Sequence, residues 1–317
     1  MAITERTNYT SSPCVLAVIM LVRKRAVAGS TNIEWATDIW NPVRGCSIVS
    51  AGCTNCYAMR YAHRFSSPGF PYEGLTKSTH GGPVWTGEVR TVPGVLDVPL
   101  RWKQPKRIFV NSMSDLFHED VPPSFIERVW LTMRGAPRHT FQILTKRAAR
   151  MRSILSSASF DSLAVLPNVW LGVSVEDQRS ADERIPLLLQ TPAAVRWISA
   201  EPLLGPVQLS RWMPCSMGDV DTCPNVPLTC CQCDDQRSSN DGLNWVVVGG
   251  ESGPKARPFD PDWASAIILQ CKSADVPVFV KQLGSRLRWE GAPVRLKARK
   301  GGDPSEWPEA LRVREYP

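Results

Sequence analysis

The chain has 317 residues, of which 43% are hydrophobic, and it carries a formal net charge of +7. This composition excludes a disordered chain and is sufficient for one large globular domain or two modest ones. The positive charge favours a polyanionic partner such as nucleic acid, but it is spread along the chain, so a solvated basic surface is the simpler explanation.

Residues 1–30 form an N-terminal extension that we set apart from the fold. Its apolar run, residues 14–22, is too short to cross a membrane. The basic residues follow this run, whereas a secretory signal carries them before it. A translation start at Met20 would also explain the stretch. We therefore expect the extension to be disordered or to precede the true start, in a cytoplasmic protein that does not bind membranes.

A group of three cysteines follows the first expected strand, which ends near Trp40. Cys46, Cys53 and Cys56 are separated by six and two residues. Three thiolates leave one position of a four-coordinate metal site open, which suits a catalytic site better than a structural zinc site. A [4Fe–4S] cluster with three cysteine ligands would likewise leave one iron free to bind a substrate or cofactor.

A zinc knuckle completed by His63 or His80 is the alternative for this group. Gly45 and Gly52 would let the loop wrap closely around a cluster. A disulfide framework is typical of short secreted chains and is not expected here.

Short apolar, β-branched runs recur after the cysteines and have the length of buried strands. They are residues 107–111, 140–145, 169–174, 195–199, 245–249 and 276–280. The clearest helices are residues 122–133 and 260–274, each with a proline near its start. Strands that alternate with helices predict a parallel sheet with right-handed crossovers.

Polar residues follow each of these strands directly. They occupy positions 112–115, 145–147, 174–176, 199–202, 249–252 and 281–282. In a parallel α/β barrel these positions share one rim, where active sites assemble. We therefore predict an α/β fold, a partial parallel barrel of the (β/α)6 type over residues 31–290, followed by a C-terminal tail, residues 291–317.

A Pro- and Asp-rich insertion, residues 212–242, interrupts the predicted barrel. It holds Cys215, Cys223, Cys230, Cys231 and Cys233, whose spacing matches no standard zinc finger. Zinc, an auxiliary cluster and a variable loop without metal all remain open for it. Cys271 lies in helix-like sequence and is expected to be packed in the core.

The segment Cys53-Thr-Asn-Cys56-Tyr-Ala58 resembles the cluster loop of radical S-adenosylmethionine (radical SAM) enzymes, especially spore photoproduct lyase and its relatives. The resemblance implies a partial barrel of the radical SAM kind and a [4Fe–4S] cluster bound by the three cysteines. It also implies S-adenosylmethionine as cofactor and assigns Tyr57 to cofactor binding.

Further residues extend this resemblance beyond the cysteines. Ser114-Asp115 is similar to a Ser-Asp pair that holds the methionyl amino group, and Thr145-Lys146 to a Thr-Lys pair whose lysine meets the methionyl carboxylate. Both would be charge-assisted contacts. Ser174 corresponds to another serine that contacts the cofactor. Without the resemblance, Asp115 could cap a turn and Lys146 could be a solvated loop lysine.

The span from Ile33 to Gly284 is similar to a phage and bacterial protein family named for its three-cysteine motif. The phrases that carry this similarity include Trp40-Asn-Pro, Ser199-Ala-Glu-Pro-Leu-Leu-Gly-Pro206 and Val248-Gly-Gly-Glu-Ser-Gly253. The chain departs from the commonest radical SAM loop, because six residues instead of three separate the first two cysteines and Asn55 replaces an aromatic residue.

Charged side chains at the strand ends complete the candidate site. Glu201, Glu251 and Lys281 are the candidate catalytic residues, which would orient the substrate or shuttle protons or pair with one another. Glu176 and Arg184 are assigned to cofactor binding, although Arg184 could equally bridge to a neighbouring carboxylate.

These features favour an enzyme that cleaves S-adenosylmethionine reductively to a 5′-deoxyadenosyl radical. The basic charge and the resemblance point to a nucleic-acid base or modified nucleotide as substrate, for example an isomerisation in the hypermodification of phage thymine. An electron donor such as flavodoxin or ferredoxin would be a partner. The alternative is a non-catalytic, metal-stabilised nucleic-acid-binding protein, which the converging glutamates disfavour because they repel phosphate.

Overall fold

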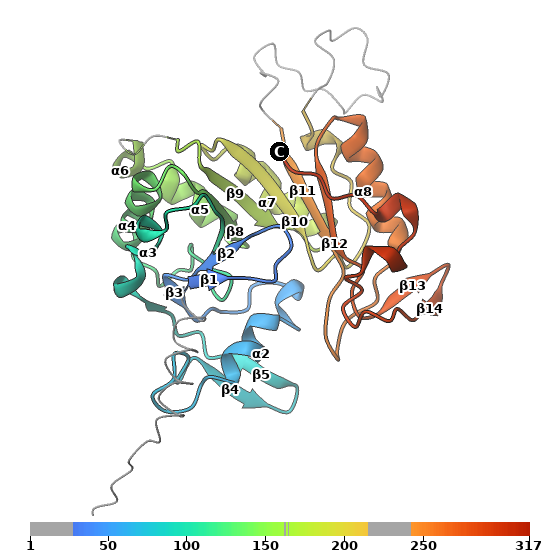
Figure 1. The fold of residues 1–317 in the computed structure, drawn as a ribbon, viewed down its shortest axis with the longest axis horizontal. Helices are drawn as coiled ribbons and strands as arrows, with labels where there is room; N and C mark the ends of the chain where they lie inside the picture. Colours follow the sequence, from blue (N-terminus) through green and yellow to red (C-terminus); the bar gives the residue numbers. More distant parts are fainter. Residues whose placement is uncertain (1–27, 162, 164, 215–241) are drawn as a thin grey trace, which may run out of the picture.

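An open, mostly parallel sheet organises the chain in the computed structural model, which describes residues 28–161, 163, 165–214 and 242–317. The sheet has 8 strands in the order β1-β2-β7-β8-β9-β10-β11-β12 (Figure 1). Only β1 is antiparallel to its neighbour; from β2 to β12 each pairing is parallel. The edge strands, β1 and β12, do not pair with each other. The protein therefore has a mixed α/β fold.

The strands of this sheet are β1 Ala28–Ser30, β2 Asp38–Trp40, β7 Arg107–Val110, β8 Thr140–Thr145, β9 Val169–Ser174, β10 Val195–Ala200, β11 Trp245–Gly249 and β12 Val278–Gln282. The six strands predicted after the cysteines are confirmed, and the last begins two residues later than expected. Because the strands from β2 to β12 run parallel, their carboxyl ends all lie on one edge of the sheet.

The helices are α2 Tyr57–His63, α3 Val98–Arg101, α4 Pro123–Gly135, α5 Ala148–Leu155, α6 Ala158–Asp161, α7 Gln178–Leu189 and α8 Pro261–Ser273. Helices α4 and α8 confirm the two predicted ones, and Cys271 is fully buried in α8, as expected. Short 3₁₀ helices are η1 Ala51–Cys53, η2 Pro93–Val95, η3 Ser210–Trp212, η5 Pro304–Glu306 and η6 Glu309–Leu311.

Three small antiparallel pairs lie outside the main sheet. They are β3 Val43–Arg44 with β6 Arg90–Thr91, β4 Thr76–Thr79 with β5 Gly82–Trp85, and β13 Leu287–Trp289 with β14 Ala292–Val294. Figure 1 places α2, β4 and β5 below the carboxyl ends of the strands.

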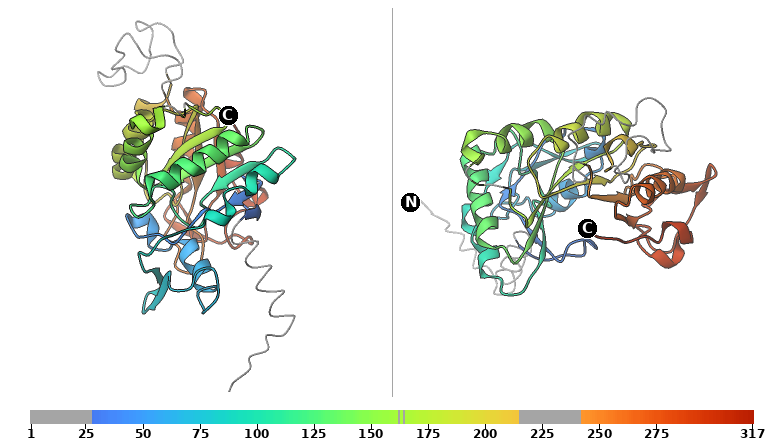
Figure 2. Two further views of the ribbon diagram at one scale, coloured as in Figure 1. Left: turned by 90° about the vertical axis from the view of Figure 1, so that its left-hand side faces the viewer. Right: turned by 90° about the horizontal axis from the view of Figure 1, so that it is seen from above.

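The two faces of the sheet bury different side chains, because successive residues of a strand point to opposite sides. In β9, Val169, Leu171 and Val173 pack into the core shared with the helices. Trp170 points the other way and joins an aromatic cluster with Trp197 and others. The helices line the outer side of the curved sheet (Figure 2).

The aromatic cluster fills the inner face at the amino ends of the strands. Trp197 and Trp245 lie in tilted contact at 5.2 Å between ring centroids, and Trp35 packs against both. Tyr316 stacks on Trp245 at 5.7 Å. The next inward positions along the strands are smaller or polar, so the inner face changes from aromatic to charged toward the carboxyl ends.

The C-terminal tail packs against this sheet. Val313 accepts a backbone hydrogen bond from Val280 in β12, and Glu315 donates one back to Val278. Trp307 and Leu311 are buried in the main core. The tail thus covers part of the free edge of β12, which would otherwise present unpaired backbone groups.

We predict that Gly172→Ala destabilises the fold. A Cβ at Gly172 would lie 2.5 Å from the ring of Trp197, which is fully buried and cannot move aside. Overpacking of this kind costs about 1–3 kcal/mol. Urea unfolding should show the loss, whereas the control Gly205→Ala, which has open space at Cβ, should unfold like the natural protein. Equal midpoints for both variants would contradict the packing argument.

Candidate functional site

The three cysteines lie on one loop between β3 and α2. Cys46, Cys53 and Cys56 are free thiols, each partly exposed. They are close enough that Cys53 and Cys56 both contribute to the rise in the pKa of Cys46. The loop lies at the carboxyl ends of the strands, as expected, because a bridge joins Gly45 to Ser114, just beyond β7.

The residues between the cysteines fasten this loop to the sheet. Ser50 donates a hydrogen bond to Glu176 Oε1 at 2.7 Å, and Asn55 donates to Glu251 Oε2 at 3.0 Å. A Cβ at Gly52 would lie 2.3 Å from Glu176 Oε1. Glycine at this position therefore permits the loop to sit directly on the Glu176 carboxylate.

Glu176 is buried with two cations. Lys146 Nζ lies 2.6 Å from Oε1 and Arg184 Nη1 lies 2.9 Å from Oε2. Burial alone would raise the pKa of Glu176, but Lys146 and Arg184, aided by the hydrogen bond from Ser50, lower it to about 2. The carboxylate is thus ionised and links the ends of β8 and β9, helix α7 and the cysteine loop.

Asp115 forms a second buried centre next to the loop. It accepts hydrogen bonds from Thr145 Oγ1 at 2.7 and 2.9 Å, from the backbone N–H of Lys146 at 3.2 Å and from Arg147 Nη1 at 3.1 Å. It also accepts from the backbone N–H of Phe117 at 3.0 Å, which caps the following turn. Protein donors therefore occupy both carboxylate oxygens.

Arg147 connects this second centre to the cysteine loop. Its Nη2 donates to Ser47 Oγ at 2.7 Å, and its Nη1 lies 3.9 Å from Cys46 Sγ. His118 Nε2 also lies 2.8 Å from Ser47 Oγ. Burial lowers the pKa of His118, and its Nδ1 accepts from the backbone N–H of Asp120. The ring is therefore neutral, with Nε2 as donor.

Glu251 and Arg257 hold the opposite side of the loop. Arg257 donates to Glu251 through Nε at 3.0 Å and Nη2 at 2.6 Å, and its Nη1 donates to the carbonyl of Ala51 at 2.9 Å. Burial would raise the pKa of Glu251, but its hydrogen bonds to Arg257 and Asn55 lower it. Glu251 thus supports the cysteine loop from the β11 side.

Glu201 and Lys281 form a separate pair at the ends of β10 and β12. Lys281 Nζ lies 2.8 Å from Glu201 Oε1 and 2.9 Å from Oε2, and Gln282 donates to Oε1 at 3.0 Å. Both charged side chains keep about a sixth of their surface exposed, 17% and 18%. This pair, unlike Glu176, retains contact with solvent.

The remaining predicted site residues make backbone contacts. The Tyr57 hydroxyl donates to the carbonyl of Ser112 at 2.6 Å although 49% of the residue is exposed. Ser114 Oγ donates to the carbonyl of Val43 at 2.7 Å, and the Ser174 carbonyl accepts from Arg184 Nη1 at 2.8 Å. All the predicted site residues thus gather at one edge of the sheet.

Sequence reasoning missed several residues of this site, among them Ser47, Ser50, His118, Arg147 and Arg257. Arg147 directly follows Lys146 at a strand end, so its position was a usable signal. Arg257 lies in an irregular loop where neither periodicity nor a motif marks it.

Within the described ranges, no group of three or more His, Cys, Asp and Glu side chains is placed to hold a metal ion. His63, the candidate fourth ligand of a zinc knuckle, instead lies 3.0 Å from Thr76 Oγ1 and 3.2 Å from Ser78 Oγ. Burial raises the pKa of Cys46 to about 12, and it raises that of Cys56. The thiols of Cys46 and Cys56 are therefore protonated in the metal-free chain, and a bound cation would have to displace their protons.

Cysteines 215–233 of the insertion and residues 1–27 of the extension lie outside the described residues. Among the helices that the structure describes, none is both long and apolar enough to cross a membrane.

The profile of a family described as "Protein of unknown function (DUF5131)" matches residues 30–305. The chain therefore belongs to this family. No curated protein and no solved structure matches the chain.

We predict that Glu176→Gln destabilises the protein most at neutral pH. Removing the charge leaves Lys146 and Arg184 without their counter-charge, which costs about 3–5 kcal/mol. The pKa of Glu176 is lower in the folded chain than in the unfolded one, so its stabilising contribution is complete above about pH 4.5 and is lost as the pH falls toward 2.

The difference in unfolding free energy between the natural protein and Glu176→Gln should therefore shrink by roughly 3 kcal/mol as the pH falls through that window. Urea unfolding at several pH values measures it. Glu183→Gln, an exposed change on the same helix, is the control and should show no such trend. A difference that does not depend on pH would show that Glu176 is not the ionised centre described above.

Proposed function

We propose that this chain is a radical SAM enzyme whose [4Fe–4S] cluster is held by Cys46, Cys53 and Cys56. The observation that carries the proposal is a loop with three free thiols that is fastened to buried charges at the carboxyl ends of three strands. The resemblance of Cys53-Thr-Asn-Cys56-Tyr57 and the strand-end residues to radical SAM enzymes supports the same function.

The chemistry of the donors fits a cluster better than a single ion. Thiolates are the usual ligands of iron–sulfur clusters. Each thiolate of a cluster binds a different iron, so its sulfurs are farther apart than those around one zinc ion. When bound, the cluster would supply one electron to the sulfonium of S-adenosylmethionine, giving methionine and a 5′-deoxyadenosyl radical.

Lys146 is the residue best placed to bind the methionyl carboxylate. It binds Glu176, the same carboxylate to which the cysteine loop is hydrogen-bonded, and 17% of its side chain is exposed. If the Lys146 side chain moved from Glu176 to pair with a ligand carboxylate, Arg184 would still neutralise Glu176. Asp115 already accepts from Thr145 and Arg147, so binding of an amino group there would displace one of these donors. Ser114, Ser174 and Tyr57 complete the proposed cofactor site.

Two of the proposed catalytic residues, Glu201 and Lys281, form the pair that keeps solvent contact, so they can orient a substrate or carry a proton. Glu251 is better described as a positioning residue, because its oxygens hold Asn55 and Arg257. In this proposal the sheet is a partial (β/α)6 barrel of the radical SAM kind, which the chain-ordered parallel strands support.

A nucleic-acid base or modified nucleotide is the proposed substrate, and isomerisation of a hypermodified thymine is one concrete reaction. The net charge of +7 supports a polyanionic substrate. Flavodoxin or ferredoxin would deliver the electron. A non-catalytic nucleic-acid-binding protein is less well supported, because Glu176, Glu201 and Glu251 converge where such a protein needs positive charge.

We predict that replacing all three cysteines of the loop by alanine abolishes the iron-dependent visible absorbance of anaerobically reconstituted protein. The natural protein, reduced in the presence of S-adenosylmethionine, should release 5′-deoxyadenosine slowly, and the triple variant should release none. Cys271→Ala is the control, since that thiol is buried in α8. Full iron content in a triple variant that also lacks cysteines 215–233 would rule out the loop as the cluster site. A fully loaded natural protein that releases no 5′-deoxyadenosine would rule out the enzyme.

We also predict that Lys146→Met weakens S-adenosylmethionine binding while leaving the iron content intact. Loss of one charge-assisted contact costs on the order of 1.5–3 kcal/mol, which is roughly a ten- to hundredfold loss of affinity. Calorimetry measures this change, with the exposed Lys272→Met on α8 as the control. If Lys146→Met and Asp115→Asn both bind the cofactor with unchanged affinity, these residues support the loop and do not touch the cofactor.

A further inference from the structure

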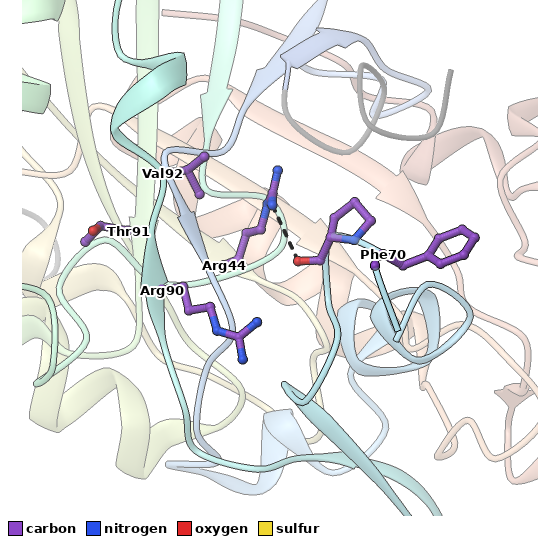
Figure 3. Close-up of a pocket in the computed structure, with 7 residues that line it drawn as sticks. Arg44, Phe70, Arg90, Thr91 and Val92 are labelled. Atoms are coloured by element: carbon purple, nitrogen blue, oxygen red, sulfur yellow. Dashed lines mark hydrogen bonds between the residues drawn. The ribbon is translucent and has the colours of Figure 1, made fainter. Parts of the chain in front are cut away.

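A pocket of about 380 Å³ lies beside the cysteine loop but outside the site described above. Its lining residues are Arg44, Gly69, Phe70, Pro71, Arg90, Thr91 and Val92, and they include no acidic side chain (Figure 3). It opens to solvent between the β3–β6 pair and the segment that follows α2. None of the residues assigned to the cluster, the cofactor or catalysis lines it.

Two arginines stand directly opposite each other in this pocket. Arg44 and Arg90 are register partners in the antiparallel pair β3–β6. Side chains at such positions have Cβ atoms about 4.5–5.5 Å apart, and like charges there repel each other. Arg90 is paired with Glu88 Oε1 at 2.6 Å. An anion that enters the pocket would accept charge-assisted hydrogen bonds from the guanidinium groups that line it.

Backbone contacts hold both guanidinium groups in place. Arg44 Nη1 donates to the carbonyl of Pro71 at 3.4 Å, and Arg90 Nη1 donates to that of Glu73 at 2.8 Å. Arg90 Nε binds Glu88, but its Nη2 makes no hydrogen bond to any described residue. Arg90 therefore keeps donor capacity while its position is set by the protein.

The other walls of the pocket suit the organic part of a nucleotide. Phe70, Pro71 and Val92 supply apolar surface, and Thr91 supplies a hydroxyl group. Phe70 comes from the segment after α2; its ring points away from the two arginines (Figure 3) and stacks on Phe65. A site with two arginines beside apolar surface suits a phosphate group that carries an organic substituent.

The pocket is also close to the proposed reaction centre. Arg44 precedes Cys46 by two residues, so their Cα atoms are at most about 7.6 Å apart. The carbonyl of Glu88 packs so closely on Gly45 that a Cβ there would lie 2.1 Å from it. The strand that carries Arg90 is thus held against the start of the cysteine loop.

We propose that Arg44 and Arg90 bind a backbone phosphate of a nucleic-acid strand while a neighbouring nucleotide of that strand lies at the cysteine loop. This inference rests on the proposed nucleic-acid substrate, and it adds a phosphate-binding subsite that the reaction itself does not require.

Binding of a labelled single-stranded oligodeoxynucleotide to the full-length protein, measured by fluorescence anisotropy over a series of salt concentrations, tests the inference. Arg44→Gln and Arg90→Gln should each weaken binding by about tenfold. The double variant should lower the slope of log affinity against log salt by about 0.7, the contribution of one neutralised phosphate of a single strand. Arg90→Gln is the safer variant for folding, since 45% of its side chain is exposed.

Arg211→Gln removes the same charge at the amino end of the sheet, where the carbonyl of Trp212 accepts from Leu243, and it should bind like the natural protein. Natural affinity and slope in the double variant would overturn the inference, and so would an equal loss in Arg211→Gln. Inorganic phosphate and thymidine monophosphate serve as competitors. If the arginine variants affect only these small ligands, the pocket takes a free nucleotide and the strand-phosphate inference is wrong.

The same natural protein is assayed for release of 5′-deoxyadenosine without oligonucleotide. Arginine-dependent binding with no release would sustain this inference and defeat the proposed chemistry. Release without any binding of the oligonucleotide would do the reverse.

Discussion

The buried carboxylate of Glu176 is the contact on which the position of the cysteine loop depends. An ionised carboxylate is costly to bury unless cations and hydrogen-bond donors surround it. Lys146, Arg184 and Ser50 meet that requirement from three different parts of the chain. The strand end, the helix and the loop therefore cannot move independently. Removing any of the three takes a hydrogen-bond donor from the buried carboxylate, so the loop is held as rigidly as the sheet.

This constraint also explains the long spacing between the first two cysteines. Six residues lie between Cys46 and Cys53, and they include Ser47 and Ser50, which reach the two buried charged centres of the sheet. A spacer of three residues would not offer both contacts. Asn55, which replaces the aromatic residue of the commonest radical SAM loop, has a polar partner in Glu251. Both differences from the commonest radical SAM loop, the longer spacer and Asn55, thus provide side chains that bind the rest of this chain.

The sequence was sufficient to predict the parallel strands and the edge at which the polar residues gather. Buried strands are continuous apolar runs such as 245–249, and their carboxyl ends share one edge whatever the details of packing. The pairing of side chains was not predictable, because the contact between Asn55 and Glu251 depends on how two distant segments meet. Arg257 could not be predicted because a single arginine in a loop carries no periodic signal, whereas the strand-end position of Arg147 could have marked it. The sequence predicted a tail separate from the barrel and did not predict its packing on the sheet. Residues 304–316 form only short 3₁₀ turns and irregular backbone, which carry no strand or helix signal.

The aromatic layer at the amino ends of the strands limits how a ligand can reach the inner face of the sheet. Trp197, Trp245 and Tyr316 close the inner face on that side, and the hydroxyl of Tyr316 is tied to the carbonyl of Glu34. A ligand therefore cannot reach the inner face from the amino ends of the strands. It can approach from the carboxyl ends, where the cysteine loop lies, or from the open side between β1 and β12. The charged half of the inner face is thus the half that a ligand meets first, and the aromatic half forms its floor.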